Sequence, residues 1–282
     1  NGPSIRVGIT ELAANAKFQI TANVPFQVLE NGNIFASKRA GETATIFADA
    51  TNTYRFTSSS PGPVFEVLTY TDTSRVPDIN FNKFRGALEV AYSQVSKKIW
   101  LLNEIPMEDY LKGLGEALNQ DHPEYRKAFQ IAARSYAMFH LQNGGKRPGE
   151  IYHLNNTASD QVYKGYNMEL RTPNLGAAVE ETKGTVAKYN GQIVRLLYSS
   201  DSGGVTVSAC QKWGGEFCTP QYEYLSGGVA DPEGTPHDPA KIAASHGVGM
   251  SAVGARRLAE LGKSFIEILK YYYKGIEIGK AY

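Results

Sequence analysis

The segment that most constrains the fold spans residues 185–198, where two strand-like stretches flank the pair Asn190-Gly191. Asn-Gly suits a type I′ turn, because both central residues of that turn take positive φ, and the turn matches the twist of a β-hairpin. The same pair occurs at Asn31-Gly32, between strand-like residues 24–30 and 33–37. The sequence therefore predicts two antiparallel hairpins.

Alternating apolar and polar residues predict a β-rich N-terminal region. The alternation runs through about the first 75 residues, and its apolar members include Ile5, Val7, Ile9, Phe18 and Ile20. Residues 71–80 are polar and contain a proline, so we predict a linker there. We expect a β-rich region at residues 1–78 and a second region at residues 79–282, which opens with further strands at 84–102.

Helical spacing dominates several later segments. Pro106 begins a helical pattern that continues to Leu118, and Pro123 fits the first position of a longer helix that Gly144-Gly145 ends. Two more helices are predicted near the C-terminus, over residues 251–261 and from a capping box formed by Ser264 and Glu267. Strands and helices together predict an α+β fold, with helices packed on antiparallel strands in the second region.

Composition excludes several classes of protein. The 282 residues are 42% hydrophobic, and 29 basic against 28 acidic residues leave a net charge of +1. The hydrophobic content argues against disorder, and the near-zero net charge argues against a nucleic-acid partner. No apolar run approaches the roughly 18 residues of a membrane span. No signal peptide is recognisable and the chain does not begin with Met, so we expect a mature or trimmed fragment.

The two cysteines, Cys210 and Cys218, predict a local disulfide that closes a loop. A zinc site would need about four Cys or His ligands at tight spacing, and no histidine lies between these two. A disulfide indicates a location outside the reducing cytosol. Two buried free thiols are the alternative.

Several polar residues are candidates for chemistry. Residues 200–204 resemble the nucleophile loop of chymotrypsin-type proteases, but His246 follows Ser202 in the chain, which is the wrong order for that triad. Glu116 has small apolar neighbours, which favours a raised pKa and a general-acid role; an exposed helical glutamate is the alternative. Arg134 lies on an apolar helix and is expected to pair with a carboxylate, Glu116 being one such partner.

A series of short motifs resembles the SpoIID/LytB family of bacterial cell-wall proteins. The motifs follow the family's order over about residues 84–278, and so many in that order make a specific signal. They are FRGALEV at 84–90, IPMEDYLKG at 105–113, Glu116, AARSYA at 132–137, DQVYKGY at 160–166, AVEETKG at 178–184, YSSDSGG at 198–204, HGVGMS at 246–251 and ILKYYY at 268–273.

The resemblance implies a set of site residues. Glu116 falls on the family's proposed catalytic acid, and Arg134 matches an arginine near that acid. Further positions match residues that line the substrate cleft: Gln161, Tyr163, Ser200, Ser202, His246 and Ser251.

The sequence also departs from the family. Ala252-Val253 replaces the usual Gln-Tyr, which would remove a substrate contact if that glutamine makes one. The stretch from Tyr110 to Glu116 is about two residues shorter than in the sporulation proteins. Some relatives carry metal ligands before Gln-Val-Tyr, but this chain has Ser159 and Asp160 there, so we predict no metal and no cofactor.

The resemblance implies a lytic transglycosylase that cleaves the MurNAc-β-1,4-GlcNAc bond of peptidoglycan and leaves 1,6-anhydroMurNAc ends. One carboxyl can serve this reaction, whereas a hydrolase would need a second acid, for which Asp160 and Asp201 are the spare candidates. The family also contains amidase enhancers, so a non-catalytic, wall-binding enhancer of an N-acetylmuramoyl-L-alanine amidase is the alternative. A structural wall-associated domain is a third interpretation. All three place the chain outside the cytoplasm. The first two have glycan strands as partner, and the enhancer adds an amidase.

Overall fold

The computed structural model of the chain describes residues 2–282 and divides into two compact units. Unit 1 comprises the residues up to Glu116 together with His140–Gly176, and unit 2 comprises Ala117–Phe139 together with Ala177–Tyr282. Each unit is thus built from two separate stretches of chain. The linker predicted at residues 71–80 lies inside unit 1.

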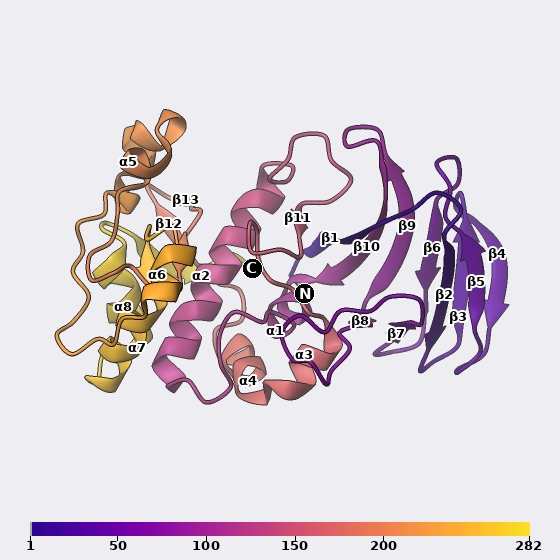
Figure 1. Cartoon of the computed structure of the whole chain (residues 1–282), viewed down its shortest axis with the longest axis horizontal. Coiled ribbons are helices and arrows are strands. Elements are labelled where there is room, and N and C mark those ends of the chain that lie inside the picture. The colour runs from indigo at the N-terminus through magenta and orange to yellow at the C-terminus, as the bar shows by residue number, and fades with distance from the viewer. Residues whose placement is uncertain (1) are drawn as a thin grey trace. The chain divides into compact units, whose positions relative to one another are not determined.

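Unit 1 is built on two sheets whose strands are almost all antiparallel (Figure 1). The larger sheet contains, in spatial order, β11 (Leu154–Asn155), β1 (Ser4–Leu12), β10 (Lys98–Pro106), β9 (Ala87–Ser93), β6 (Tyr54–Thr57), β3 (Phe26–Glu30) and β4 (Asn33–Lys38). The smaller sheet contains β5 (Ala44–Phe47), β2 (Lys17–Ala22), β7 (Val64–Val67) and β8 (Lys83–Arg85). Among the described residues of unit 1, only the short β11 pairs in parallel, with β1.

Aromatic side chains join the two sheets of unit 1. Phe18 of the smaller sheet lies 5.5 Å from Phe56 of the larger one, measured between ring centroids. Phe65 contacts Phe26 in the same way at 5.6 Å. All four rings are at most 3% exposed, so the alternation seen in the sequence reflects side chains that enter a shared core. The hairpin predicted at Asn31-Gly32 is confirmed as β3–β4.

The helices of unit 1 are short. They are α1 (Met107–Lys112) and α3 (Tyr166–Arg171). The prediction that the first helix continues to Leu118 is wrong, because α1 ends at Lys112. Beyond it, Leu114 forms an antiparallel bridge with Tyr163, so the backbone groups that would continue the helix pair with another segment.

Two longer helices have residues in both ranges. They are α2 (Pro123–Gln142), which belongs to unit 2 up to Phe139, and α4 (Pro173–Glu181), which belongs to unit 2 from Ala177. The predicted start of α2 at Pro123 is confirmed, and the Gly144-Gly145 pair lies just beyond its end.

Unit 2 combines small sheets with short helices. A three-stranded sheet has the order β13 (Gln192–Ile193), β12 (Thr185–Tyr189), β16 (Glu277–Lys280), and β14 (Tyr198–Ser199) pairs in parallel with β15 (Met250–Ser251). Its helices are α5 (Ala209–Trp213), α6 (Pro239–Ala244), α7 (Ala252–Glu260) and α8 (Phe265–Tyr272), with 3-10 turns η1 (Gly215–Cys218) and η2 (Pro220–Leu225).

The C-terminal predictions agree well with unit 2. The hairpin at Asn190-Gly191 is present, although its second strand ends at Ile193 rather than near residue 198. The capping box of Ser264 and Glu267 opens α8. The α+β class is therefore confirmed. Within residues 2–282, no helix has both the length and the apolar character to cross a bilayer.

Candidate functional site

Glu116 lies on a turn that follows α1 and is half-buried. The turn is held by backbone pairing with residues 162–164. The Gly115 N–H donates to the Val162 carbonyl at 2.8 Å, and the Lys164 N–H donates to the Gly113 carbonyl at 2.8 Å. Glu116 is therefore carried by a short antiparallel pairing and not by a helix, which replaces the alternative of an exposed helical glutamate.

Close packing around this turn depends on Gly113. A Cβ at this position would lie 2.5 Å from the Tyr163 ring, so any side chain would separate the paired segments. Tyr163 is 1% exposed and its hydroxyl donates to Asn103 Oδ1 at 2.8 Å. Gln161 is equally buried and accepts from the Tyr110 hydroxyl at 2.9 Å. We refer to residues 113–115 paired with residues 162–164 as the Glu116 seat.

Asp160 lies just before this pairing and is fully enclosed. Its carboxylate contacts Arg147 at 2.6 and 3.1 Å, Lys146 at 2.9 Å and the Asn155 N–H at 2.7 Å. Burial alone would raise the pKa of Asp160, but these donors outweigh it and hold the pKa below its ordinary value. Asp160 is therefore an ionised carboxylate and is poorly suited to donate a proton near neutral pH.

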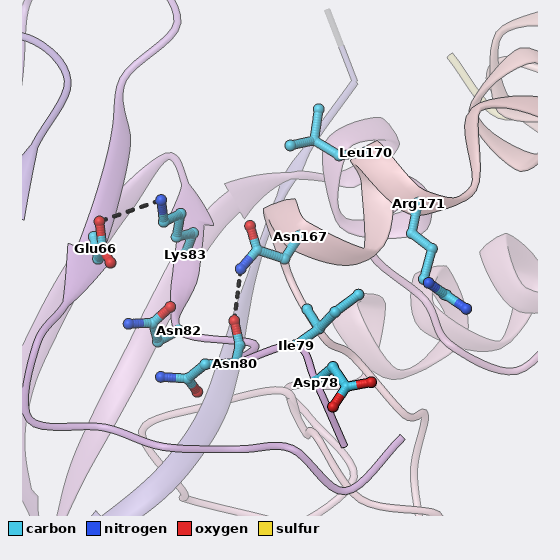
Figure 2. A pocket seen from close by; sticks show the side chains of 9 residues that line it. All are labelled: Glu66, Asp78, Ile79, Asn80, Asn82, Lys83, Asn167, Leu170 and Arg171. Atoms are coloured by element: carbon cyan, nitrogen blue, oxygen red, sulfur yellow. Dashed lines mark hydrogen bonds and ion pairs between the residues drawn. The ribbon is translucent and has the colours of Figure 1, made fainter. Parts of the chain in front are cut away.

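A hollow of about 530 Å³ opens elsewhere in unit 1 (Figure 2). Most of its lining residues are polar, and part of that lining is internally paired, since Lys83 contacts Glu66 at 3.3 Å and Asn167 donates to the Asn80 carbonyl at 2.6 Å. No residue singled out from the sequence lines it. The lining residues are Glu66, Asp78, Ile79, Asn80, Asn82, Lys83, Asn167, Leu170 and Arg171.

Arg134 is fully buried on α2 in unit 2. Its guanidinium donates to the Thr185 carbonyl at 3.1 Å and to the Val179 carbonyl at 3.3 Å. Two of the family-like segments, AARSYA and AVEETKG, are therefore in contact through this side chain. Glu116 belongs to unit 1, so the pairing of Arg134 with Glu116 stays a prediction.

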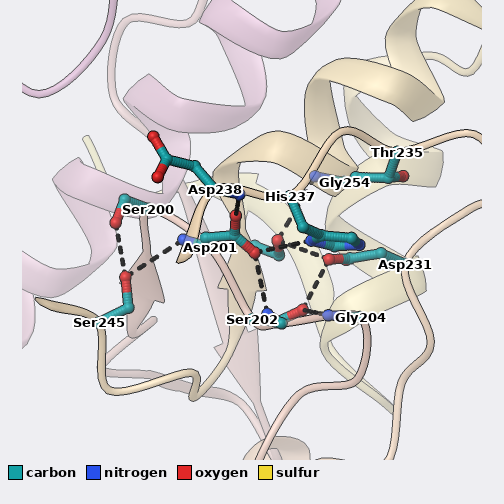
Figure 3. A network of polar contacts seen from close by, with 12 residues as sticks. Ser200, Asp201, Ser202, Gly204, Asp231, Thr235, His237, Asp238, Ser245 and Gly254 are labelled. Carbon is teal, nitrogen blue, oxygen red and sulfur yellow. Dashed lines mark hydrogen bonds and ion pairs between the residues drawn. The ribbon is translucent and has the colours of Figure 1, made fainter. Parts of the chain in front are cut away.

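Asp231 is the centre of a hydrogen-bond network in unit 2 (Figure 3). Its Oδ2 accepts from the hydroxyls of Ser202 at 2.6 Å and Ser251 at 2.9 Å, and its Oδ1 accepts from the Tyr272 hydroxyl at 2.7 Å. Burial and the neighbouring Asp231 charge raise the pKa of Tyr272, so that hydroxyl stays protonated and donates. Three of the family-like segments meet at this one carboxylate, which the sequence analysis missed.

Gly254 shows how closely the chain packs around Asp231. A Cβ at Gly254 would lie 2.1 Å from both Asp231 Oδ1 and the Tyr272 hydroxyl, so a side chain would break their contact. The Ser251 side chain also caps α7 by accepting from the Gly254 N–H at 3.4 Å, and Ser251 is fully buried.

Asp201 organises the neighbouring loop. It accepts from the Gly203 N–H at 2.9 Å and the Asp238 N–H at 2.9 Å, and contacts His237 Nδ1 at 2.8 Å. Burial would raise the pKa of Asp201, but these three contacts lower it overall. Like Asp160, Asp201 is held as a carboxylate.

One group in the part of the chain that the structure describes has the residue types of a metal site: Asp201, Asp231 and His237 lie with their ligand atoms within 4.8 Å of one another. Both carboxylates already accept hydrogen bonds on each oxygen. A cation would have to displace these donors, so the group fits a hydrogen-bonded scaffold better than a metal centre.

His246 is half-buried and Ser200 is exposed. The Ser200 and Ser245 hydroxyls are 2.5 Å apart, and Ser245 Oγ also accepts from the Asp201 N–H at 3.3 Å. His246 Nδ1 accepts from the Val248 N–H at 3.0 Å, and its ring lies 5.3 Å from the Trp213 ring. Cys210 and Cys218 form a disulfide in the loop that carries this tryptophan.

The predicted site residues thus fall into two groups. Glu116, Gln161 and Tyr163 come together in unit 1, whereas Arg134 and the residues Ser200, Ser202, His246 and Ser251 belong to unit 2. Asp231, His237 and Trp213 are additional polar or aromatic residues of unit 2. Asp231 follows Gly228-Val229-Ala230, and Trp213 lies between the two cysteines. Neither position has a strong signal in a single sequence, so neither residue was predicted.

Comparison with known proteins identifies relatives for most of the chain. Residues 95–189 match a family model described as Stage II sporulation protein, and this range includes Glu116 and Arg134. An uncharacterised protein of Brachyspira hyodysenteriae is 28% identical over 254 residues, covering 63% of this chain and 68% of the relative. Stage II sporulation protein D of Bacillus amyloliquefaciens is 23% identical over 261 residues, 64% of this chain and 76% of the relative.

A third relative is similar over a shorter stretch. The amidase enhancer of Bacillus subtilis is 38% identical over 90 residues, which is 32% of this chain. This stretch covers 11% of the enhancer's own length. The chain therefore shares one part of that larger protein.

Proposed function

The chain belongs to the SpoIID/LytB family, and from this membership we propose that it is a lytic transglycosylase that cleaves peptidoglycan glycan strands with Glu116 as its catalytic acid and base. The observation that carries the proposal is the position of Glu116, which is half-buried on a braced turn within the range that matches the family model. Asp160 and Asp201, the other candidate acids, are held ionised by their donors. A mechanism that needs only one proton-transferring carboxyl fits this set.

The reaction would proceed as follows. Protonated Glu116 gives its proton to the glycosidic oxygen, and the GlcNAc residue leaves with a free 4-hydroxyl. The 6-hydroxyl of the same MurNAc attacks its anomeric carbon, and the Glu116 carboxylate accepts the proton that this hydroxyl releases. The product is a 1,6-anhydro end, no water is consumed, and Glu116 returns to its protonated form. A hydrolase would need a second carboxyl about 5–10 Å away.

The other predicted site residues would divide into two roles. Ser200, Ser202 and His246 are exposed or half-buried, and we assign them to contact with the sugar. The remaining four are at most 1% exposed and already hydrogen-bonded, so we assign them to positioning: Arg134, Gln161, Tyr163 and Ser251.

The test is mass spectrometry of soluble products after incubation with peptide-bearing and peptide-free glycan strands. Glu116→Gln should lower the rate of release of anhydro-ended products by at least about 100-fold, the usual scale for loss of a general acid. Glu277→Gln, an exposed glutamate on β16, is the matched control and should retain full activity. Reducing-end products would indicate a hydrolase and overturn the transglycosylase.

A second candidate is a wall-binding enhancer of an N-acetylmuramoyl-L-alanine amidase, favoured by the similarity to the Bacillus subtilis amidase enhancer. This role requires strand binding but no acid, so Glu116→Gln would leave it intact. The enhancer would be supported if the chain binds strands, gives no cleavage products, and speeds the release of strands by an added amidase. Both candidates act on the cell wall outside the cytoplasm, a location in which the disulfide would persist.

A further inference from the structure

A disulfide-closed loop in unit 2 presents an exposed tryptophan. The Cys210–Cys218 bridge joins α5 to η1, and Trp213 is the last residue of α5, between the two cysteines. Gly214 and Gly215 follow with φ of 64° and 55°, values that favour glycine and allow the reversal directly after the indole. The loop is therefore short, cross-linked and built to reverse at this tryptophan.

Trp213 is unusual in combining exposure with a fixed position. Its residue is 45% exposed, whereas Trp100, the other tryptophan of the chain, is 8% exposed in the core of unit 1. Its ring lies 5.2 Å from Phe217 and 5.3 Å from His246. Phe217 is braced in turn by Arg195, whose guanidinium carbon lies 4.5 Å from the ring centroid. A large aromatic side chain that is braced yet remains open to solvent is a feature of binding surfaces.

Hydrogen-bonding groups adjoin this aromatic surface. Ser245 immediately precedes His246, and its hydroxyl pairs with Ser200 at 2.5 Å. Ser200 is exposed. A sugar ring has an apolar face of C–H groups and an equatorial rim of hydroxyls, so it needs both an aromatic face and nearby polar partners. A purely apolar partner would leave the serine hydroxyls without a role.

We propose that Trp213 and His246 form a sugar-stacking subsite, in which the indole packs against a pyranose ring of the glycan strand and the Cys210–Cys218 bridge holds the indole in place. This inference deepens the proposed function and rests on it. The sugar bound at this subsite would have the Ser200 and Ser245 hydroxyls as polar partners for its own hydroxyl groups. Trp213 is then a binding residue and takes no part in proton transfer.

The first test uses the small number of tryptophans. In a Trp100→Phe background, Trp213 is the sole tryptophan, so its fluorescence reports on the subsite alone. Addition of soluble, peptide-free GlcNAc–MurNAc strands should shift the emission to shorter wavelength with saturation. Fluorescence that is unchanged while an independent assay shows bound strands would overturn the subsite.

The second test measures strand affinity in variants. Trp213→Ala should weaken binding about fivefold to tenfold, the scale of one aromatic contact. Trp213→Phe should lose less, and Trp213→Leu, which keeps apolar bulk without an aromatic face, should lose as much as alanine. Phe47→Ala removes a comparably exposed aromatic residue from β5 of unit 1 and should bind strands as the wild type does. Wild-type affinity of the leucine variant would overturn the stacking.

The disulfide gives a third measurement. A Cys210→Ser, Cys218→Ser double variant should weaken strand binding about threefold to tenfold, because the indole must then be ordered on binding. Adding Trp213→Ala to this variant should bring the total loss to that of Trp213→Ala alone and no further. A full additional loss would show that the bridge and the indole act independently, against the proposal.

Failure of the subsite can be told apart from failure of the proposed function. If the wild type cleaves strands and Trp213→Ala keeps the same kcat/KM, the subsite is wrong and the transglycosylase stands. If strands bind in a Trp213-dependent way but are never cleaved, the subsite stands and the transglycosylase is wrong. A wild type that neither binds nor cleaves strands would overturn both.

Discussion

The two units hold their candidate residues by different physical means. In unit 1, the Glu116 seat is built from backbone pairing and glycine packing. In unit 2, the loop around Ser202 is held by side-chain hydrogen bonds that converge on two aspartates. The first arrangement depends on the shape of the chain and the second on charge. The two units should therefore respond differently to substitutions that change size and to those that change charge.

The largest effect on stability should come from removing the centre of the unit 2 network. Asp231→Ala deprives three hydroxyls of their acceptor, and two of these belong to buried residues, Ser251 and Tyr272. An unsatisfied buried polar group costs about 1–3 kcal/mol, so we expect the free energy of unfolding to fall by about 3–5 kcal/mol. Urea denaturation at an unchanged m-value measures it.

Asp238→Ala is the matched control for Asp231→Ala. Asp238 caps α6 by accepting from the Ala240 N–H at 2.9 Å, and losing a helix cap costs about 1 kcal/mol. Equal losses from the two variants would show that Asp231 is not the centre of the network. The network of unit 2 would then not depend on the charge of one central aspartate.

A size change should break the Glu116 seat. Gly113→Ala places a Cβ 2.5 Å from the Tyr163 ring and so displaces the turn. Because a misplacement of about 1 Å can cost about 100-fold in rate, we expect kcat/KM for strand cleavage to fall by about that factor. Product release followed by mass spectrometry measures it.

Gly115→Ala provides the control two residues away. Its Cβ would lie 3.0 Å from Met168 Cε, the mobile end of a flexible side chain, so the turn should accommodate it. We expect less than about a fivefold change in kcat/KM. Equal losses from Gly113→Ala and Gly115→Ala would argue that the seat does not position Glu116.

Acid should destabilise both units, but high salt should reduce this destabilisation to different extents in the two units. The pKa values of Asp160 and Asp201 are lowered in the folded chain, so their contribution to stability is complete above the unfolded value near 4. It is lost as the pH falls through their lower folded values, because protonation then favours the unfolded state. Thermal unfolding between pH 6 and pH 2 should therefore show a falling midpoint below about pH 4.

The partners of the two aspartates differ. Asp160 contacts Arg147 and Lys146, whereas Asp201 relies partly on backbone N–H groups. Raising NaCl to 1 M screens charges, so it should reduce the fall in the unfolding midpoint at low pH. We expect a larger reduction in an Asp201→Asn variant, in which Asp160 remains, than in an Asp160→Asn variant. The reverse order would contradict this assignment. Asp78→Asn, an exposed position, should leave the acid profile unchanged.

The sequence predicted the parts that rest on local chemistry. Asn-Gly turns, the capping box at Ser264 and the start of α2 at Pro123 are determined within a few residues, and all three are present. The end of α1 was predicted wrongly because the pairing of Leu114 with Tyr163 joins residues 49 positions apart. Asp231 and Trp213 were missed for the same reason, since their importance arises only from distant partners.

The smallest effects should separate a sugar-contacting hydroxyl from a structural one. Ser200 is exposed and its hydroxyl pairs with the Ser245 hydroxyl, so Ser200→Ala should change the free energy of unfolding by less than about 1 kcal/mol. If Ser200 contacts the sugar, KM should nevertheless rise about threefold to tenfold with little change in kcat.

Ser208 is the matched control, because its hydroxyl accepts from the Gln211 N–H at 3.4 Å and caps α5. Ser208→Ala should cost about 1 kcal/mol in stability and leave KM unchanged. A Ser200→Ala variant with wild-type KM would remove Ser200 from the substrate site. Unit 2 would then be a charge-held scaffold whose contact with the strand depends on its aromatic loop.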